Sequence, residues 1–578
     1  MKFKIFLLAI FLAIGTVCCA KDWWENGNFY QIYPRSFKDS DGDGIGDLNG
    51  VTENLQYLKD IGITAAWLSP IFQSPMEDFG YDISDYYEIQ KEYGTVEDFE
   101  NLLKKAKQIG IRIILDFVPN HTSDKHKWFQ LSAAGHPYYR DFYVWQNGTI
   151  NSETGERQPP NNWLGSFRYS AWEWNEQRQQ YYLHQFGVMQ PDLDYRNPAV
   201  VEEMKKVMRY WLGKGVSGFR IDAVPFLFEY IDENGKFPDE PVRTDSQCPD
   251  PDDYCHLQHI YTNNQPETFD MVYQWRELVD NWKKENGGET KVLLTEAYTS
   301  FDNLMKLYGD GIRNGSHVPF NFELLNTMNA NSTAKDFRYQ ITRWLKTMPK
   351  GVYANWVLGN HDNKRLASRF GPERTDLLNI LLQTLPGIAV TYNGEEIGMT
   401  DGPISWEDTV DPQGCSANPD NYNSYSRDPA RTPFQWNSSK NAGFSNAIKT
   451  WLPTNADYTT KNVENQLSAS RSHLKIFTKA LSLRHIPAFD EGTFDIKAPS
   501  EGILVYKREK IGDDCYIIVL NLGKQDKNIN LNNFFDVKGA SVEVITASVQ
   551  SKLKDGQIVD SQAMKIEGSV GVILKVIQ

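Results

Sequence analysis

A recurring unit, in which an amphipathic helix precedes a short apolar strand, constrains the fold of this chain more than any other feature. Thr95 opens one helical pattern that Gly110 ends, and the apolar segment IRIILDFVPNH follows it. The same order returns at residues 200–212, 269–285 and 375–385, each time before another apolar strand. Strands that are apolar on both faces and alternate with helices are typical of a parallel sheet covered by helices.

A closed barrel and an open doubly wound sheet both fit this alternation. A nucleotide-binding doubly wound sheet carries a glycine-rich fingerprint after its first strand, and the sequence has none at that place. We therefore predict an α/β protein built on a closed βα barrel. Two regions depart from the alternation, because residues 122–189 are aromatic-rich without periodicity and the end of the chain has short alternating strands. The predicted domains are a barrel at 21–121 and 190–485, an insert at 122–189, and a C-terminal antiparallel β-sandwich at 486–578.

The first residues have the pattern of a secretory signal peptide. Lys2 and Lys4 precede an apolar run, and small residues end at Ala20, after which we expect cleavage. No later run reaches the ~18 apolar residues that a membrane span needs, so we expect a secreted, extracellular protein without a membrane anchor. The net charge of -15 argues against nucleic acid as a partner.

In a secreted protein, cysteines can form disulfides and N-x-S/T sequences can be glycosylated. Cys248 and Cys255 lie seven residues apart in a loop rich in Pro and Asp, and we expect a disulfide between them in an oxidising compartment. Asn120 matches the glycosylation pattern but is expected to be buried. The expected glycosylation sites are Asn147, Asn314, Asn331 and Asn437.

The segment DSDGDGIGDLNG has the composition of a cation-binding loop. Its acids, with glycines between them that let the loop turn tightly, are Asp39, Asp41, Asp43 and Asp47. The spacing is close to that of an EF-hand, except that Gly50 occupies the place of the bidentate glutamate. A set of solvated turns is the alternative, but four neighbouring carboxylates repel one another without a cation. We predict a structural Ca²⁺ or Mg²⁺ and no organic cofactor.

Polar residues follow the apolar strands at equivalent places. They are His121, Arg220 with Asp222, Glu296, and His361 with Asp362. Barrel enzymes build their sites at the carboxyl ends of the strands, so these residues are expected to meet. Arg220 and Asp222 are two apart in a strand and would share a face, where the guanidinium keeps the carboxylate ionised. Taken alone, such a pair is more often a structural ion pair, and the other polar residues at the strand ends favour the functional interpretation.

Three carboxyl groups without a Cys/His metal cluster or a serine nucleophile motif favour cleavage of glycosidic bonds. In this chemistry one carboxylate attacks the anomeric carbon while another carries a proton to the leaving oxygen. Asp222 fits the first role because of its arginine, and Glu296, in an apolar setting near aspartates, fits the second. Asp362 and the histidines would bind hydroxyls and stabilise positive charge on the sugar.

In this order, DFVPNH, GFRIDAV, TEAY and GNHD resemble the successive motifs of the α-amylase family of glycoside hydrolases. QPDLD resembles a further motif of the α-glucosidase branch and departs from it at Asp194. The chain as a whole is most similar to the secreted maltases of insects. This resemblance implies a (β/α)8 TIM barrel with an inserted B domain and a C-terminal β domain. It also implies a retaining mechanism with Asp222 as nucleophile, Glu296 as acid/base and Asp362 as transition-state stabiliser.

The resemblance also implies further site residues. Asp82 in FGYDISDYY, with His121, Arg220 and His361, would hold the non-reducing glucose, joined by Arg431. The backbone oxygen of Ile45 would complete the cation site.

The expected activity is that of an exo-acting α-glucosidase. It would release terminal α-1,4-linked glucose from maltose and maltooligosaccharides, and glucose from sucrose. Ala223, the residue after the nucleophile, resembles that of branch members that cut α-1,4 bonds or sucrose rather than α-1,6 bonds. A catalytically inactive relative that serves as a binding or receptor protein is one alternative, and an endo-acting amylase is another.

Overall fold

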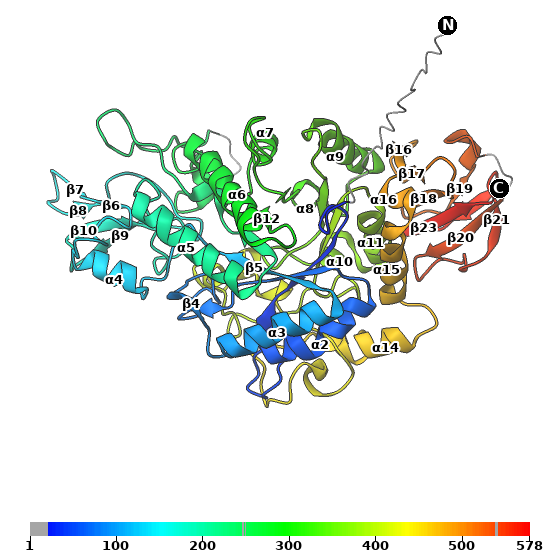
Figure 1. Ribbon diagram of the computed structural model, residues 1–578, viewed down its shortest axis with the longest axis horizontal. Helices are drawn as coiled ribbons and strands as arrows, with labels where there is room; N and C mark the ends of the chain where they lie inside the picture. The colour runs from blue at the N-terminus through cyan, green and yellow to red at the C-terminus, as the bar shows by residue number, and fades with distance from the viewer. Residues whose placement is uncertain (1–20, 245–247, 249, 538–540, 578) are drawn as a thin grey trace, which may run out of the picture.

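Eight parallel strands form the central sheet of the computed structural model, which describes residues 21–244, 248, 250–537 and 541–577 (Figure 1). Their order across the sheet is β13-β12-β11-β5-β2-β1-β15-β14. The strands are β1 Asn28–Ile32, β2 Ala65–Leu68, β5 Arg112–Phe117, β11 Gly218–Ile221, β12 Val292–Thr295, β13 Val318–Pro319, β14 Asn355–Val357 and β15 Ile388–Tyr392. The barrel that the alternation predicts, with the (β/α)8 form that the resemblance implies, is confirmed.

One side chain joins the two end strands, β13 and β14, whose backbones do not pair. Asn355 at the start of β14 donates from Nδ2 to the Pro319 carbonyl at 2.6 Å, and its Oδ1 accepts from the Asn321 backbone N–H at 2.7 Å. Asn355 is fully buried. A short polar side chain therefore completes the ring where backbone pairing is missing.

Helices cover the outside of the barrel. The longer ones are α2 Leu48–Asp60, α3 Val96–Ile109, α5 Pro198–Lys214, α6 Pro266–Asn286, α9 Ala334–Thr347, α11 Thr375–Thr384 and α15 His473–Ser482. The shorter ones are α1 Pro34–Phe37, α7 Phe301–Lys306, α8 Glu323–Asn326, α10 Leu366–Phe370, α12 Pro412–Cys415, α13 Tyr422–Tyr425, α14 Val463–Ser468 and α16 Pro487–Asp490. Thr95 caps α3 together with Asp98, and Gly110 ends the helix with φ 78°. Asp47 caps the N-terminus of α2, where its side chain accepts from the Gly50 backbone N–H.

Residues 122–189 contain a separate small sheet, drawn in cyan at the end of the molecule away from the C-terminus (Figure 1). It consists of β6 Trp145–Gln146, β9 Trp172–Asn175 and β10 Gln180–Leu183, beside the hairpin β7 Thr149–Ile150 and β8 Arg157–Gln158 and the helix α4 Lys127–Ala133. A backbone bridge between His121 and Asp192 joins the two points where the insert leaves and re-enters the barrel. The short hairpin β3 Phe72–Gln73 and β4 Asp85–Ile89 lies earlier in the chain.

The C-terminal region, coloured orange to red, is an antiparallel β domain (Figure 1). Its larger sheet contains β16 Thr493–Lys497, β17 Ile503–Glu509, β18 Cys515–Asn521, β20 Ser541–Ala547, β21 Ile558–Asp560 and β23 Val570–Val576. The pair β19 Lys527–Ile529 and β22 Met564–Ile566 shares a hydrophobic core with it. On the other face, Gly571 lets β23 approach α11, since a Cβ there would lie 3.0 Å from Cα of Leu377.

The predicted disulfide between Cys248 and Cys255 is present, with 5.8 Å between the Cα atoms. Asn120 is buried, as expected, and Asn147, Asn314 and Asn331 are exposed while Asn437 is half-buried; their glycosylation stays a prediction. Among the described residues, no helix has both the length and the apolar character needed to cross a bilayer. The predicted signal peptide, residues 1–20, lies outside the described residues.

Replacing Asn355 by alanine tests the closure of the barrel. Asn355→Ala leaves a buried carbonyl at Pro319 and a buried N–H at Asn321 without partners, so we expect a loss of about 2–4 kcal/mol in the free energy of unfolding. The measurement is the shift of the urea unfolding midpoint. Asn286→Ala, at the exposed end of α6, is the matched control with an expected change within about 0.5 kcal/mol; equal midpoints for the two variants would refute the role of Asn355.

Candidate active site

Strand register brings Asp222 and Glu296 to the same level of the barrel mouth. Ile221 in β11 pairs with Thr295 in β12, and each acid is the residue that follows. The backbone N–H of Glu296 donates to the Ile221 carbonyl at 2.9 Å, and that of Asp222 donates to the Phe117 carbonyl in β5, also at 2.9 Å. Neighbouring parallel strands that end together therefore place the two carboxyl groups side by side at the C-terminal end of the barrel.

One buried guanidinium contacts three carboxyl groups. Nη1 of Arg220 donates to both oxygens of Asp116, at 3.0 and 3.1 Å, and to Oδ1 of Asp222. Its Nη2 lies 3.6 Å from Oε2 of Glu296. Arg220 is 1% exposed and its guanidinium stacks on the ring of Trp67 at 4.9 Å. The acids predicted to react thus share one fixed cation.

Asp362 lies in a different electrostatic environment. Nη2 of Arg431 donates to its Oδ1 at 3.0 Å, Nη1 of Arg427 lies 3.5 Å away, and Nε2 of His361 lies 3.4 Å away. Burial opposes ionisation, but the positive groups together hold the pKa of Asp362 below its usual range. Asp362 is therefore a permanent negative charge at the mouth of the barrel.

Glu296 and Asp222 lie in different electrostatic environments because, of the two, only Asp222 is directly bound to Arg220. Burial, aided by repulsion from Asp222 and Asp362 and opposed by Arg220, raises the pKa of Glu296 to about 8. Burial also raises the pKa of Asp222, where the directly bound Arg220 guanidinium opposes the rise. The backbone N–H of Ala223 donates to Oε2 of Glu296 at 2.7 Å, which fixes the orientation of that carboxyl. The site therefore presents a protonated glutamic acid at neutral pH beside an aspartate that is ion-paired with arginine.

These acids line a cavity of about 230 Å³. This volume is below the ~300–1,000 Å³ typical of sites for drug-sized ligands, which favours a small substrate. The side chains that surround it are Asp78, Tyr81, His121, Ser166, Phe167, Phe186, Gln190, Asp222, Ala223, Phe226, Glu296, Tyr298, Asp362, Gln413 and Arg427. Ser166 and Phe167 come from the insert, so the insert forms part of the wall.

The structure brings most of the predicted site residues together. His121, Asp222, Glu296 and Asp362 line the cavity, and burial lowers the pKa of His121 to about 4, so its imidazole is neutral. Arg220, His361 and Arg431 lie behind the lining and orient it through contacts with Asp222 and Asp362.

The prediction that Asp82 holds the substrate is wrong. Its carboxylate points into its own loop, where it accepts from Ser74 Oγ at 2.7 Å, from Glu77 N–H at 2.9 Å and from Asp78 N–H at 3.1 Å. Asp78, four residues earlier, lines the cavity instead and pairs with Arg427 at 2.8 Å. Its partner lies 349 residues away in the sequence, so the letters EDFGYD alone do not distinguish the two aspartates.

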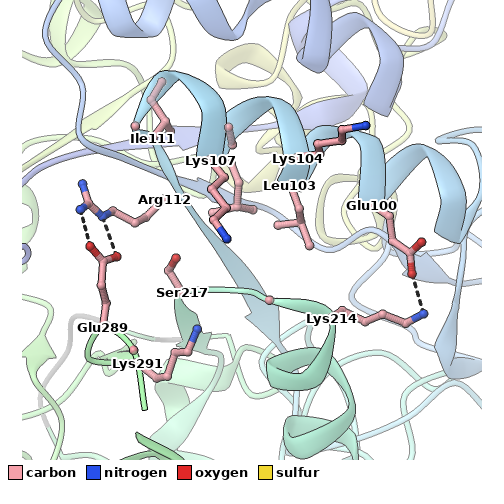
Figure 2. A pocket seen from close by; sticks show the side chains of 15 residues that line it. Glu100, Leu103, Lys104, Lys107, Ile111, Arg112, Lys214, Ser217, Glu289 and Lys291 are labelled. Carbon is pink, nitrogen blue, oxygen red and sulfur yellow. Dashed lines mark hydrogen bonds and ion pairs between the residues drawn. The ribbon is translucent and has the colours of Figure 1, made fainter. Parts of the chain in front are cut away.

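Another hollow, of about 660 Å³, lies at the opposite end of the barrel and lacks paired carboxyl groups of this kind. Figure 2 shows that two of its cations are already paired, Arg112 with Glu289 and Lys214 with Glu100. Lys107 and Lys214 belong to the last turns of α3 and α5. Lysines there offset the negative ends of the helices, which is a structural role.

The predicted cation loop gathers three of its four aspartates. Carboxylate oxygens of Asp39, Asp41 and Asp43 lie within 4.8 Å of one another. Burial, with repulsion from the neighbouring aspartates, raises the pKa of Asp43. Asp47 is not part of this cluster, and its oxygens accept from the backbone N–H groups of Ser40 and Gly50. Three hard oxygen ligands on one turn fit a divalent cation.

A (β/α)8 barrel with paired carboxyl groups at its C-terminal mouth defines a barrel-type glycoside hydrolase. The chain belongs to the α-amylase family, since the family model for the alpha amylase catalytic domain matches residues 31–492.

Similar proteins cover almost the whole chain. Maltase A1 of Drosophila melanogaster is 61% identical over 98% of both chains, and a salivary alpha-glucosidase of Anopheles gambiae is 52% identical over 96% of this chain and 93% of the relative. Among solved structures, a mutant of the trehalulose synthase MutB in complex with the substrate sucrose matches with a TM-score of 0.83 and 33% identity, covering 96% of this chain and 100% of that chain.

Burying Glu296 has a stability consequence that depends on pH. Its pKa of about 8 in the folded protein exceeds the ordinary glutamate value of 4.5, so the folded state holds a proton that the unfolded chain releases. The free energy of unfolding of the parent protein therefore falls as the pH rises from 4.5 to about 8, because Glu296 keeps its proton only in the folded state. Glu296→Gln is expected to raise the free energy of unfolding by about 1–3 kcal/mol at pH 7 and to leave it unchanged at pH 4.

Urea unfolding of the parent and Glu296→Gln at both pH values measures this effect. Glu464→Gln, on the exposed start of α14, is the control and is expected to change little at either pH. A Glu296→Gln protein that is less stable than the parent at pH 7 would contradict the raised pKa.

Proposed function

We propose that the protein is an exo-acting, retaining α-glucosidase that releases terminal α-1,4-linked glucose from maltose and maltooligosaccharides, and the α-linked glucose of sucrose. The observation that carries this proposal is the contact of Asp222 and Glu296 with one guanidinium, that of Arg220, at the mouth of the barrel. The names of the similar proteins, maltase and alpha-glucosidase, agree with it. The complex of MutB with sucrose supports sucrose as a substrate class.

In the first step, the protonated Glu296 donates its proton to the glycosidic oxygen while Asp222 attacks the anomeric carbon. The bond between that carbon and the leaving oxygen breaks as the ester to Asp222 forms, so the departing sugar leaves as a neutral alcohol. Asp362, held as an anion by Arg431, Arg427 and His361, stabilises the positive charge that develops on the sugar ring.

In the second step, the Glu296 carboxylate takes a proton from a water molecule that attacks the same carbon from the opposite side. The ester bond breaks, Asp222 regains its negative charge, and glucose is released with its anomeric configuration retained. Glu296 is protonated again and the cycle closes. The raised pKa of Glu296 and the ion pair of Asp222 with Arg220 support this division of roles.

The small volume of the cavity, about 230 Å³, supports attack at chain ends. Asp78 and Arg427 form an ion pair in its lining, and the insert contributes Ser166 and Phe167 to the wall. A pocket of this size accepts one terminal sugar and excludes the interior of a long polysaccharide. An endo-acting amylase needs an open groove, and an inactive binding protein needs neither the paired acids nor the raised pKa of Glu296.

Side-by-side hydrolysis assays on maltose, sucrose, isomaltose and starch test the proposal. We expect rapid release of glucose from maltose and sucrose, and slow release from isomaltose and starch. Faster attack on starch than on maltose would favour the endo-acting alternative, and no turnover of any of them would favour the binding protein.

Asp222→Asn separates catalysis from folding. Without a nucleophile, kcat on maltose is expected to fall by at least about 10⁴-fold. The fold is expected to persist because Arg220 still pairs with Asp116 at 3.0 Å. The measurements are maltose turnover and the circular dichroism melting curve, with the exposed Asp526→Asn as control. Turnover of Asp222→Asn within tenfold of the parent would disprove the assignment.

We also propose that the loop of Asp39, Asp41 and Asp43 binds a structural Ca²⁺ or Mg²⁺, with Asp47 and the backbone oxygen of Ile45 near it. The closeness of the three carboxylates supports this site. The loop leads directly into α2, whose N-terminus Asp47 caps, so the cation would fix the start of a barrel helix. Its role is stability, since it takes no part in the chemistry at Asp222.

Asp41→Ala tests the cation site. Removing one ligand is expected to lower the melting temperature and to make it insensitive to a chelator, while the parent loses up to about 3 kcal/mol of stability when chelated. Thermal melting with and without EDTA, followed by added Ca²⁺, measures both effects. The control is Asp513→Ala, on an exposed turn of the C-terminal domain. If EDTA leaves the melting of the parent unchanged, the loop holds no cation.

We propose, finally, that residues 1–20 are a signal peptide and that the mature protein is extracellular. The disulfide between Cys248 and Cys255 and the salivary origin named for similar alpha-glucosidases support secretion.

A further inference from the structure

Tyr298 is a cavity-lining residue that the proposed mechanism does not use. It follows Glu296 by two residues on the loop after β12, and both side chains line the same cavity. Its ring stacks on that of Phe322 with centroids 4.7 Å apart and an interplanar angle of 25°. Phe322 is buried, whereas Tyr298 is 42% exposed. The ring is therefore held in place on one side and open on the other.

Two asparagine amides determine the direction in which the hydroxyl of Tyr298 can donate its proton. Its oxygen accepts from Nδ2 of Asn360 at 2.9 Å and from Nδ2 of Asn363 at 3.0 Å. The amide orientations are fixed independently, because Oδ1 of Asn360 accepts from the backbone N–H of Asp362 at 3.1 Å and from Nδ2 of Asn363 at 2.9 Å. Both asparagines therefore present N–H groups to the tyrosine.

These two bonds use the acceptor capacity of the phenol oxygen and leave its proton free to donate. Burial of the hydroxyl, with the nearby negative charge of Asp362 and Glu296, raises the pKa of Tyr298, so the proton stays on the oxygen. Among the described residues, none accepts a hydrogen bond from this O–H. The remaining direction for donation is the cavity.

The leaving group lies on the side of Glu296, because that acid protonates the glycosidic oxygen, whereas the transferred glucosyl ring faces Asp222. Tyr298 is 42% exposed and lies on the loop that carries Glu296, whereas Asp222 is buried, so the tyrosine belongs to the open, leaving-group side of the cavity.

We propose that the Tyr298 hydroxyl donates a hydrogen bond to an oxygen of the leaving sugar and makes the enzyme selective for α-glucosides whose leaving group is itself a sugar. This inference rests on the proposed α-glucosidase activity. Asn360 and Asn363 are positioning residues, since they act by turning the tyrosine proton toward the leaving group.

Tyr298→Phe keeps the ring and its stacking and removes only the hydroxyl. The expected result is a fall of about 5- to 20-fold in kcat/KM for maltose. For p-nitrophenyl α-glucoside, whose leaving group has no hydroxyl to accept the bond, the expected fall is below about twofold. Tyr273→Phe is the matched control, because its hydroxyl donates to the Lys306 carbonyl at 2.7 Å and lies outside the cavity lining.

A double-mutant cycle with Asn363→Ala tests the orienting bond. Asn363→Ala alone is expected to show part of the loss on maltose, and Tyr298→Phe/Asn363→Ala is expected to be no worse than Tyr298→Phe, since the asparagine acts through the hydroxyl. Additive losses would show that Asn363 acts independently.

The activities of Tyr298→Phe and of the parent on the two substrates distinguish this inference from the proposed function. Equal losses on maltose and on the aryl glucoside, or no loss on either, would overturn the role of Tyr298 while leaving the α-glucosidase activity of the parent in place. A parent that hydrolyses neither substrate would overturn the proposed function itself.

Discussion

The rest of the site depends on the ion pairs of the Arg220 guanidinium with the surrounding carboxyl groups. This guanidinium is buried in the barrel, bound to Asp116 and Asp222 and within 3.6 Å of Glu296. Without this cation, three carboxyl groups in one low-dielectric space would repel one another and take up protons. With it, Asp222 gains a partner that favours its ionised form while Glu296, farther from the charge, keeps a pKa of about 8. One arginine in β11 thus creates an acid and a nucleophile from similar groups.

The barrel makes that arrangement possible by aligning strand ends. Asp222 and Glu296 both follow the register pair of Ile221 and Thr295, so their separation is set by the spacing of neighbouring strands rather than by flexible loops. The second group of charges, Arg427 and Arg431 around Asp362, comes from the loop region after β15. The insert closes the remaining side with Ser166 and Phe167. The rigid layer holds the reacting acids, and the added segments shape the cavity around them.

The sequence predicted those features that depend on local periodicity and on strand ends. The apolar strands, the cap at Thr95 and the acids directly after β11 and β12 are visible in the letters alone, because each obeys a short-range rule. Contacts between distant segments had no such signal. Asp78 is distinguished from Asp82 only by Arg427, closure of the barrel depends on Asn355 reaching Pro319, and the proton of Tyr298 is directed by two asparagines more than sixty residues away. Each of these is a tertiary hydrogen bond or ion pair.

Trapping the covalent intermediate tests the central claim most directly. A fluorinated glucosyl fluoride that forms the ester rapidly and hydrolyses slowly would leave the sugar on the attacking residue, and peptide mass spectrometry of the digested protein would locate it. The account predicts one added glucosyl group on the peptide that contains GFRIDAV, at Asp222. A label on Glu296 or Asp362, or release of the sugar with no labelled peptide at any time, would contradict the division of roles that Arg220 is held to impose.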